Sequence, residues 1–593
     1  MFPGKGLVIL AIILASDKTH LTNFSGDKVM YPVYLSLGNI EKGVRAKLSS
    51  DCWVLFAKIP VSKFAKTYFN TTLTEAEKKG MPALLRKILF HECLRHALAP
   101  LRIRSIDGLK PQEPRMLLDA HARVRLGFSV VLGWCTDLEE HQDILGLARY
   151  SCPKCLARFK DLDTWVAGEH QPCGPRTSDS ILNEVLRIRH EYPKASTWQF
   201  KMLAKTSGLS GVERFCWEGH WGDFCRIVAL DDLHGIMKAL KDHLFSWIVA
   251  SIGADRVDAG LIAQPHRIGL CNFPNGITHI SQFSGRENRD LQRHIIGGVI
   301  GADGATPALL KSLRGALDFS YTAQLPMHTD RTLRLMQEHL AVYNKSKYYF
   351  IQNRTRTSKR GEPHMRIPKA HNWEHFAADI RDHGTLDNTS TETGETLHKK
   401  KCKRPYALSN RKDPDRQILD RLMREEIIDD FARFIGWQLQ KVSESDNSDG
   451  FPSSCAADVD LLREARAEEV TNTLPGIRLA KRPHYSLATN TIAAIYDCPD
   501  FVPALHRYFV GDGDRGFTQR ARSYTGVFDV PPQLRNLDVW QRFSLERRLP
   551  NKYYSAQPHI IHCRPPLGAR TAVYDTVLVE VDPTKLDFVL SKC

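Results

Sequence analysis

Three cysteines and one histidine lie close together in the sequence, with a spacing that suits a bound metal ion. Cys152, Cys155, His170 and Cys173 follow the pattern C-x2-C-x14-H-x2-C. Zinc prefers thiolate and imidazole ligands, and two tightly spaced pairs joined by a loop are typical of tetrahedral structural sites. The spacing therefore predicts a structural Zn²⁺ site. The alternative is a group of buried thiols without a metal.

A carboxylate follows an apolar run near the N-terminus. Residues 7–15 are all apolar and include several β-branched side chains, and Ser16 and Asp17 come directly after them. The run is too short to cross a bilayer as a helix. It is typical of a buried central strand that ends in a carboxylate, and the alternative is the core of a signal peptide. We favour the strand because the chain that follows is basic and has no transmembrane pattern.

Basic residues gather in two stretches that could contact phosphate. The first stretch comprises Lys399, Lys400, Lys401, Lys403 and Arg404. In the second, residues 345–360, Lys and Arg alternate with aromatic side chains, a pattern that can follow a nucleic-acid backbone and stack on bases. The whole chain has 82 Lys and Arg against 67 Asp and Glu, a net charge of +15. This surplus favours DNA or RNA as a partner, and the alternatives are a solvated basic surface or a nuclear-import signal.

The elements that must position these residues point to a mixed α/β protein. Strand-like runs at 53–60 and 126–132 flank a helical pattern at 74–96, and such alternation indicates an α/β core. Residues 231–345 have a mostly helical pattern, and residues 413–441 form the clearest helix. A chain of 593 residues exceeds one compact core, so roughly three to four domains are expected. Its 14 cysteines form no disulfide framework, which suits a reducing compartment.

Several motifs resemble those of Plavaka-type transposases from fungal DNA transposons, distant relatives of the CACTA group. The most specific block joins Ser16-Asp17-Lys18-Thr19 to YPVYLSLGNI at residues 31–40. The resemblance continues in order through CPKC at 152–155, DDLH at 231–234, PKAH at 368–371 and ETLH at 395–398. It extends to the C-terminal residues and so covers nearly the whole chain.

The resemblance implies an RNase H-like catalytic core with three carboxylates, the DDE triad. Such a core cleaves and transfers DNA strands with two divalent cations, Mg²⁺ or Mn²⁺, held by oxygen ligands. By resemblance, Asp17 is the first carboxylate, Asp137 the second and Glu395 the third, with Glu392 as the alternative for the third. The family usually has Pro two residues after the second acid, where this chain has Glu139. For each acid the alternative is a solvated carboxylate without a catalytic role.

Asp231 and His234 resemble the D-x-x-H signature of related transposases. At a spacing of three residues on a helix, the two side chains share a face and could orient DNA or a metal. The alternative is that Asp231 or Asp232 caps the N-terminus of a helix that buries Leu233.

Six regions are expected from these patterns and the resemblance. They are the first part of the RNase H-like core (1–150), a Cys/His-rich zinc-knuckle region (151–230), a mostly helical insertion (231–385), the last part of the core with the third acid and the long helix (386–441), a linker (442–474) and a small β-rich module (475–593).

The expected function is that of a DDE transposase that acts on transposon ends in the nucleus, or an inactive remnant of one. One alternative is a domesticated DNA-binding protein that does not cut, and another is a secreted or membrane-attached protein with an N-terminal signal. We expect no membrane partner, and a homo-oligomer is among the expectations. Because family members usually have a longer N-terminal region, the resemblance also suggests a copy that has lost its DNA-targeting part.

Overall fold

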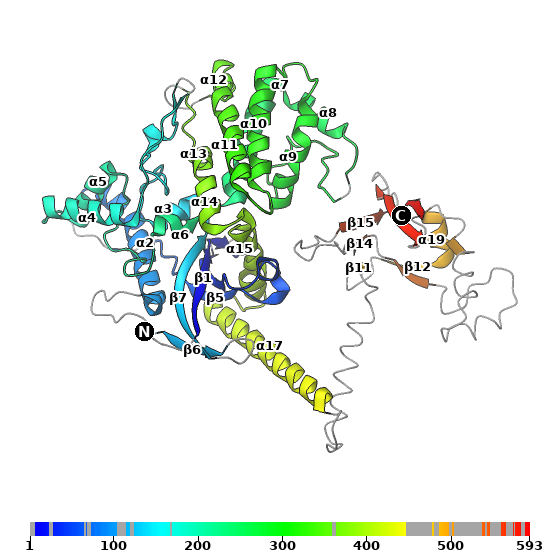
Figure 1. Ribbon diagram of the computed structural model, residues 1–593, viewed down its shortest axis with the longest axis horizontal. Coiled ribbons are helices and arrows are strands. Elements are labelled where there is room, and N and C mark those ends of the chain that lie inside the picture. The colour runs from blue at the N-terminus through cyan, green and yellow to red at the C-terminus, as the bar shows by residue number, and fades with distance from the viewer. Residues whose placement is uncertain are drawn as a thin grey trace. The chain divides into compact units, whose positions relative to one another are not determined.

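The computed structural model describes most of residues 6–445 and short segments beyond them (Figure 1). The described residues are 6–22, 28–64, 67, 73–102, 114–118, 124–166, 169–267, 269–357, 363–445, 477–479, 485–496, 501–502, 536–539, 542–545, 559–564, 573–574, 576–582 and 587–592. The chain divides into two compact units, one formed by residues 1–265 and 271–430 and the other by residues 266–270 and 431–593. The elements of both confirm the predicted mixed α/β class.

A mixed sheet forms the centre of the first unit. Its strands are β1 (Gly6–Ser16), β4 (Pro32–Leu37), β5 (Val54–Lys58), β6 (Arg115–Leu118), β7 (Val124–Cys135) and β10 (Val228–Ala229). The order is β10-β7-β1-β4-β5, with β6 paired to β7. β1 runs parallel to β7 and antiparallel to β4, β5 is antiparallel to β4, and β10 is parallel to β7. Figure 1 shows β1 and β7 side by side. The apolar run of residues 7–15 is thus the central strand, as predicted.

Residues 12–15 of β1 are buried in different hydrophobic clusters on the two faces of the strand, whereas Ile9 in its first half is 57% exposed. Ile12 and Leu14 pack in one cluster with Phe90 of α2 (Glu75–Ala97). Ile13 and Ala15 belong to another cluster, on the opposite face. Successive side chains of a strand point to opposite faces, so a strand covered on both sides needs apolar residues at every position. The second cluster includes Leu397 of α15 (Glu392–Leu397) and residues of α17 (Pro414–Ser445).

Shorter helices connect the sheet to the rest of the first unit. They are α1 (Lys42–Arg45), α3 (Leu138–Ile144), α4 (Ser178–Glu191), α5 (Thr197–Thr206), α6 (Phe224–Ile227) and α16 (Arg404–Ala407). Two-stranded pairs are formed by β2 (Thr19–His20) with β3 (Val29–Met30) and by β8 (Trp165–Val166) with β9 (Glu169–His170).

A helical region with its own hydrophobic core lies between β10 and α15, which confirms the predicted helical pattern of residues 231–345. Its α-helices are α7 (Ser246–Ile252), α8 (Ala254–Ile262), α9 (Gly285–Val299), α10 (Pro307–Ala323), α11 (Asp330–Ser346), α12 (Tyr349–Gln352), α13 (Pro368–Asn372) and α14 (Phe376–His383). Helices α8 and α9 approach very closely. A Cβ atom at Gly260 would lie 2.0 Å from the carbonyl oxygen of Gly298, so only glycine fits there.

The second unit is described only in short elements. They are α19 (Thr489–Ile495) and the strands β11 (Ile477–Leu479), β12 (Tyr485–Ala488), β13 (Asn536–Val539), β14 (Arg542–Leu545), β15 (His559–Arg564), β16 (Val573–Tyr574), β17 (Thr576–Asp582) and β18 (Asp587–Lys592). The independent β-rich module stays a prediction. Within the predicted linker, residues 442–445 belong to α17, and residues 446–474 lie outside the described residues. Among the helices that the structure describes, none has the length and apolar character to span a membrane.

Candidate functional site

Two predicted carboxylates leave the central sheet at the same edge. β1 and β7 are parallel, and Ala15 pairs with Cys135 near their ends. Asp17 and Asp137 each come two residues after these partners, so both follow the same ends of neighbouring parallel strands. Asp137 is also the N-cap of α3, and its Oδ1 accepts a hydrogen bond from the backbone N–H of Glu140 at 2.9 Å.

The third predicted carboxylate joins them from a distant part of the chain. Glu395, on α15, lines one small pocket together with Asp17, Asp137 and His234. The remaining lining residues are Ala15, Ser16, Tyr34, Cys135, Thr391, Gly394 and His398. The alternative third acid, Glu392, does not line this pocket, because it forms an ion pair with Arg289 of α9.

The pocket is unfavourable for negative charge on Asp17. Burial raises the pKa of Asp17 to about 6, and the carboxylates of Asp137 and Glu395 also raise it, against the opposing effect of His234. Carboxylates held near one another in a partly buried site disfavour each other's ionisation, and a bound cation would remove that penalty.

Asp231 and His234 connect the end of β10 to the third carboxylate. Nδ1 of His234 lies 2.7 Å from Oδ2 of Asp231, and its Nε2 lies 3.3 Å from Oε1 of Glu395. Burial lowers the pKa of His234, but the hydrogen bonds to Asp231 and Glu395 outweigh burial and raise the pKa to about 10. His234 is therefore an imidazolium that donates to both carboxylates.

Asp231 makes the contacts of a helix cap, the alternative considered for it, and it also holds Thr391. Its carboxylate accepts hydrogen bonds from the backbone N–H groups of Leu233 at 3.2 Å and His234 at 2.7 Å, as a capping residue does. It also accepts from Oγ1 of Thr391 at 2.8 Å and from the backbone N–H of Thr391 at 3.2 Å. Because Thr391 immediately precedes α15, Asp231 fixes the start of the helix that carries Glu395. Asp231 itself does not line the pocket.

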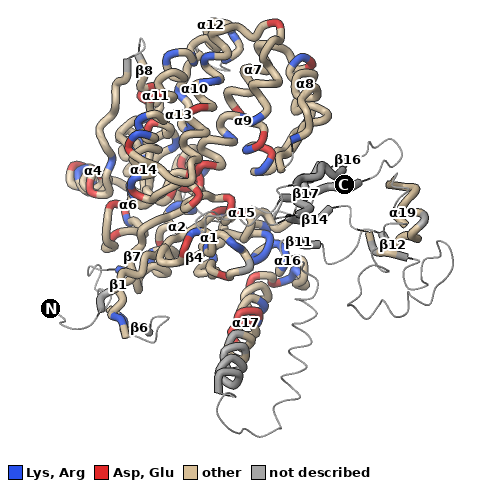
Figure 2. The backbone as a smooth tube through the Cα atoms, turned by 45° about the vertical axis from the view of Figure 1, so that its right-hand side comes forward, with Lys and Arg blue, Asp and Glu red and all other residues tan. Residues whose placement is uncertain are grey.

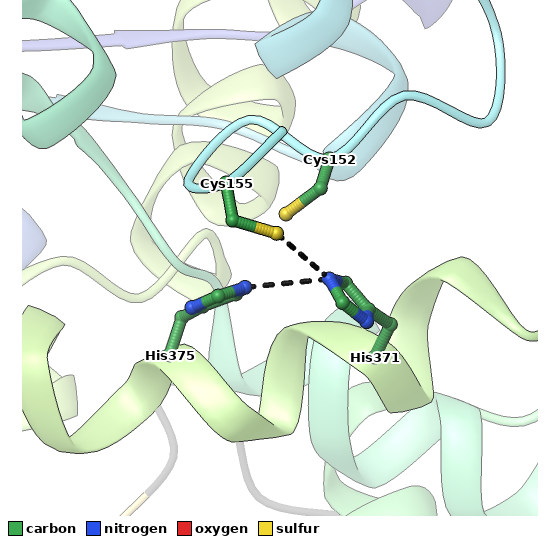
Figure 3. A group of neighbouring side chains, drawn as sticks. All are labelled: Cys152, Cys155, His371 and His375. Carbon is green, nitrogen blue, oxygen red and sulfur yellow. Dashed lines mark hydrogen bonds between the residues drawn. The ribbon is translucent and has the colours of Figure 1, made fainter. Parts of the chain in front are cut away.

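A second cluster of potential ligands contains Cys152 and Cys155, but its histidines differ from the predicted one. Figure 3 shows both cysteines of a tight turn facing His371 and His375. One ligand atom from each residue lies within 4.8 Å of all the others. This is the only such group of His, Cys, Asp and Glu among the residues that the structure describes.

The geometry of this cluster fits a tetrahedral metal ion. Sγ of Cys155 lies 3.2 Å from Nε2 of His371, and the Nε2 atoms of His371 and His375 are 3.4 Å apart. Ligands about 2.0–2.3 Å from one ion are separated by such distances. Nδ1 of His371 lies 3.0 Å from the carbonyl oxygen of Leu162. A proton on that nitrogen leaves Nε2 free to bind the metal.

The pKa of Cys152 also suits a metal ligand. Burial raises it, but hydrogen bonds from Cys155 and from the backbone N–H of Lys154, together with nearby Arg176, outweigh burial and lower it. Thiolate is the form that binds zinc.

The prediction that His170 and Cys173 complete the ligand set differs from the structure, in which His371 and His375 lie beside the two cysteines. In the β8–β9 pair, His170 lies opposite Trp165, and its Nε2 is 3.1 Å from Oε2 of Glu374. Cys173 packs against the cluster that contains Cys152 and Cys155 without joining the ligand group. The predicted ligands are close together in the sequence, whereas the two histidines of the α13 region lie about two hundred residues after the cysteines. Their spacing of four residues was the available signal, because such residues share a helix face.

Lys154 connects the turn of Cys152 and Cys155 to the end of β10. It lies between the two cysteines, and its Nζ is 2.5 Å from Oδ1 of Asp379 and 2.6 Å from the carbonyl oxygen of Val228. The other oxygen of Asp379 accepts from the backbone N–H of Leu230 at 2.9 Å. Val228 belongs to β10, and Asp231 follows that strand. Polar contacts therefore run from the cysteine turn to Leu230, the residue before Asp231.

The predicted phosphate-binding residues divide into two groups. Nζ of Lys400 lies 2.6 Å from Oδ1 of Asp51, and Lys401 is buried with its Nζ 3.7 Å from the same oxygen. These two cations neutralise a carboxylate of the protein. Lys399, Lys403 and Arg404 are exposed, and Figure 2 shows this basic segment leading to α16.

In the second basic stretch, several described side chains at residues 347–350 contact other residues of the protein, whereas Lys345 and Arg354 are exposed. Phe350 is fully buried, and the hydroxyl of Tyr348 donates to the carbonyl oxygen of Trp165 at 2.7 Å. Nζ of Lys347 lies 2.8 Å from Oδ1 of Asp163. The expectation that this stretch stacks on bases is therefore wrong for these residues.

Comparison with known proteins supports the resemblance seen in the sequence. The family model described as Plavaka transposase matches residues 2–248. This part contains Asp17, Asp137, the two cysteines of the metal cluster and the Asp231–His234 pair, whereas Glu395 and the two cluster histidines lie beyond it. No curated protein matches the chain.

Replacing Asp17 with Asn should stabilise the metal-free protein in a pH-dependent way. Because the folded-state pKa of Asp17 is raised from 3.8 to about 6, folding opposes its ionisation, and stability falls as pH rises from about 4 to 6. Asn has no such penalty. Urea unfolding without added divalent cations should show a gain of about 1–2 kcal/mol at pH 7.5 and almost none at pH 4, after allowance for partial solvent access. Asp303→Asn, whose side chain is 89% exposed, is the control. An equal change at both pH values would contradict the assignment.

Zinc binding should depend on His371 and His375 and not on His170. Loss of a ligand around the metal is harsher than loss of a supporting residue, so His371→Ala and His375→Ala should each weaken zinc binding by more than about 100-fold. His170→Ala should change it by less than about threefold. Zinc competition titrations and the visible spectrum of the Co²⁺-substituted protein would measure this. Metal loss in His170→Ala with retention in His371→Ala would restore the set predicted from the sequence.

Proposed function

We propose that this chain, whose residues 2–248 match the Plavaka transposases, is a DDE-type transposase that cleaves and transfers DNA strands with divalent cations. The observation that carries the proposal is the convergence of Asp17, Asp137 and Glu395 on one pocket. They come from the ends of two neighbouring parallel strands and from a helix that follows a long helical region. Because its substrate is chromosomal DNA, we expect it to act in the nucleus.

The topology of the central sheet supports an RNase H-like core. In such a core the first three strands form an antiparallel meander, and two later strands add on the other side, parallel to the first. Here β1, β4 and β5 form the meander, and β7 and β10 are the later strands. In this proposal the helical region between β10 and α15 is an insertion into the core.

The three acids offer the oxygen ligands that Mg²⁺ and Mn²⁺ prefer. Two such cations, when bound, would activate water or a 3′-hydroxyl and stabilise the leaving oxygen. The protein itself holds the three carboxylates in position. The strand ends hold Asp17, the start of α3 holds one oxygen of Asp137, and His234 holds Glu395 by a charge-assisted contact. Asp231 is a positioning residue in this scheme, since it acts through His234 and Thr391.

The cluster of Cys152, Cys155, His371 and His375 suits a structural zinc ion rather than a catalytic one. All four positions of a tetrahedron would be filled by protein ligands, so none remains open for substrate. Zinc there would join the cysteine turn to α13 and, through Lys154, support the strand end that carries Asp231.

The exposed cations after Glu395 are the best candidates for contact with DNA phosphates. Replacing Lys399, Lys403 and Arg404 with Ala should weaken binding to duplexes of any sequence. It should also reduce the slope of log K against log salt by about 0.9 per lost contact, or about 2.7 for all three. Fluorescence anisotropy between low and moderate salt would measure the slope. Lys400→Ala is the matched control, because Asp51 already neutralises this lysine. An unchanged slope in the triple variant would exclude this surface.

DNA nicking tests the function directly. Purified protein should nick duplex DNA that carries the transposon ends with Mg²⁺ or Mn²⁺, and Asp17→Ala should abolish the activity because a metal ligand is lost. Glu392→Gln is the matched control, since this acid lies on the same helix as Glu395 but outside the pocket. It should retain nicking.

Two results would overturn the proposal. Nicking by Asp17→Ala at the rate of the unsubstituted chain would exclude this site. Absence of nicking by the unsubstituted chain, together with intact DNA binding, would make the protein a non-catalytic DNA-binding protein.

A further inference from the structure

We propose that Glu140, a buried acid of α3, is a positioning residue for the carboxylate pocket, because it holds the ends of β1 and β7 that precede Asp17 and Asp137. The inference rests on the proposed function and deepens it, since it names a group that orients metal ligands without touching a cation itself. Glu140 does not line the pocket, and it is only 6% exposed.

Glu140 contacts both strand ends. Its backbone N–H donates to Oδ1 of Asp137 at 2.9 Å. Its side-chain Oε1 accepts a hydrogen bond from the hydroxyl of Ser16, the last residue of β1. The next residue in the chain is Asp17. A single residue therefore connects the second carboxylate to the residue that precedes the first.

The hydroxyl of Ser16 is also held from the neighbouring strand. Nε1 of Trp134, on β7, donates to this hydroxyl at 2.8 Å, and both residues are buried. The indole N–H, the serine hydroxyl and the carboxyl oxygen of Glu140 form a chain of hydrogen bonds, and the members of such a buried chain strengthen one another. The chain runs from β7 to β1 and on to α3. It therefore restrains the three elements around Asp17 and Asp137.

The residue after Asp17 is held beside Glu140 as well. The ammonium group of Lys18 lies 4.8 Å from the centre of the Tyr31 ring, a cation–π contact. This ring stacks on Phe90 with the ring centres 5.6 Å apart. Burial raises the pKa of the Tyr31 hydroxyl, and the nearby carboxyl group of Glu140 raises it further. Asp17, which lines the pocket, is therefore restrained through both of its neighbours in the chain.

Stability alone does not explain an acid at this buried position. Burial penalises a carboxyl group far more than an apolar side chain of similar size, so an apolar residue would serve a purely structural role at least as well. What the carboxyl group adds is a hydrogen-bond acceptor at a fixed point between two strand ends. Loss of a residue that orients a metal ligand typically lowers metal affinity or activity by about 10–100-fold.

Binding of Mn²⁺ to the full chain, followed by the electron paramagnetic resonance signal of the free ion, tests the role of Glu140. The binding that is lost in Asp17→Ala defines the pocket. Glu140→Leu removes the acceptor of Ser16 and should weaken this binding by about 10–100-fold, whereas Glu140→Gln keeps an accepting oxygen and should stay within about threefold. Glu139→Gln is the matched control, because this neighbouring acid of α3 has a side chain that is 72% exposed. It should bind Mn²⁺ as the unsubstituted chain does.

Ser16→Ala removes the other end of the same contact, and it keeps the test decisive if Glu140→Leu folds poorly. It should weaken the same Mn²⁺ binding. In the double variant the two effects should fall short of their product, because substitutions of residues in direct contact are not additive. A structural role without positioning would lower the melting temperature and leave the Mn²⁺ affinity of the folded chain unchanged.

The outcomes separate this inference from the function on which it rests. Unchanged pocket binding in Glu140→Leu, or effects of the two substitutions that multiply fully, would overturn the role of Glu140 and leave the proposed function intact. Absence of any Asp17-dependent Mn²⁺ binding in the unsubstituted chain would overturn the metal site of the proposed function and this inference with it.

Discussion

The candidate active site depends on the parallel pairing of β1 with β7. Parallel neighbours end at the same edge of a sheet, so Asp17 and Asp137 come together although more than one hundred residues separate them. The pairing also explains the apolar residues 12–15 of β1, because this part of the strand is buried on both faces. An antiparallel pairing would place the two carboxylates at opposite ends of the strands.

Carboxylates that lie close together repel one another, and neighbouring groups reduce this repulsion in different ways. Burial and the neighbouring carboxylates raise the pKa of Asp17. Glu395 has an imidazolium partner in His234, whose own pKa is raised by Asp231 and Glu395 despite burial. Asp231 can remain ionised inside the protein because two backbone N–H groups, Thr391 and His234 satisfy its oxygens. A pocket lined by three carboxylates thus lies in a chain whose net charge is +15.

The Cys/His cluster and the Asp231–His234 pair both lie beside the end of β10. Lys154 belongs to the cysteine turn, yet its ammonium group contacts the strand that precedes Asp231. A metal held by Cys152, Cys155 and the histidines of the α13 region would therefore restrain the helical region and the edge of the sheet together. A metal bound there would restrain the strand end that precedes Asp231.

The sequence by itself determined the mixed α/β class, the strand at residues 7–15, the long helix after residue 413 and the resemblance to Plavaka transposases, now supported over residues 2–248. These features depend on local periodicity and short motifs. Each such pattern lies within one continuous segment of the chain. Only the tertiary structure decided that Glu395 and not Glu392 lines the pocket, that His371 and His375 replace His170 and Cys173, and that Lys400 and Lys401 neutralise Asp51. Each of these outcomes joins residues that are far apart in the chain. Spacing along a sequence cannot reveal such partners, because the packing of β10, α13 and α15 around the central sheet is what brings them within bonding distance.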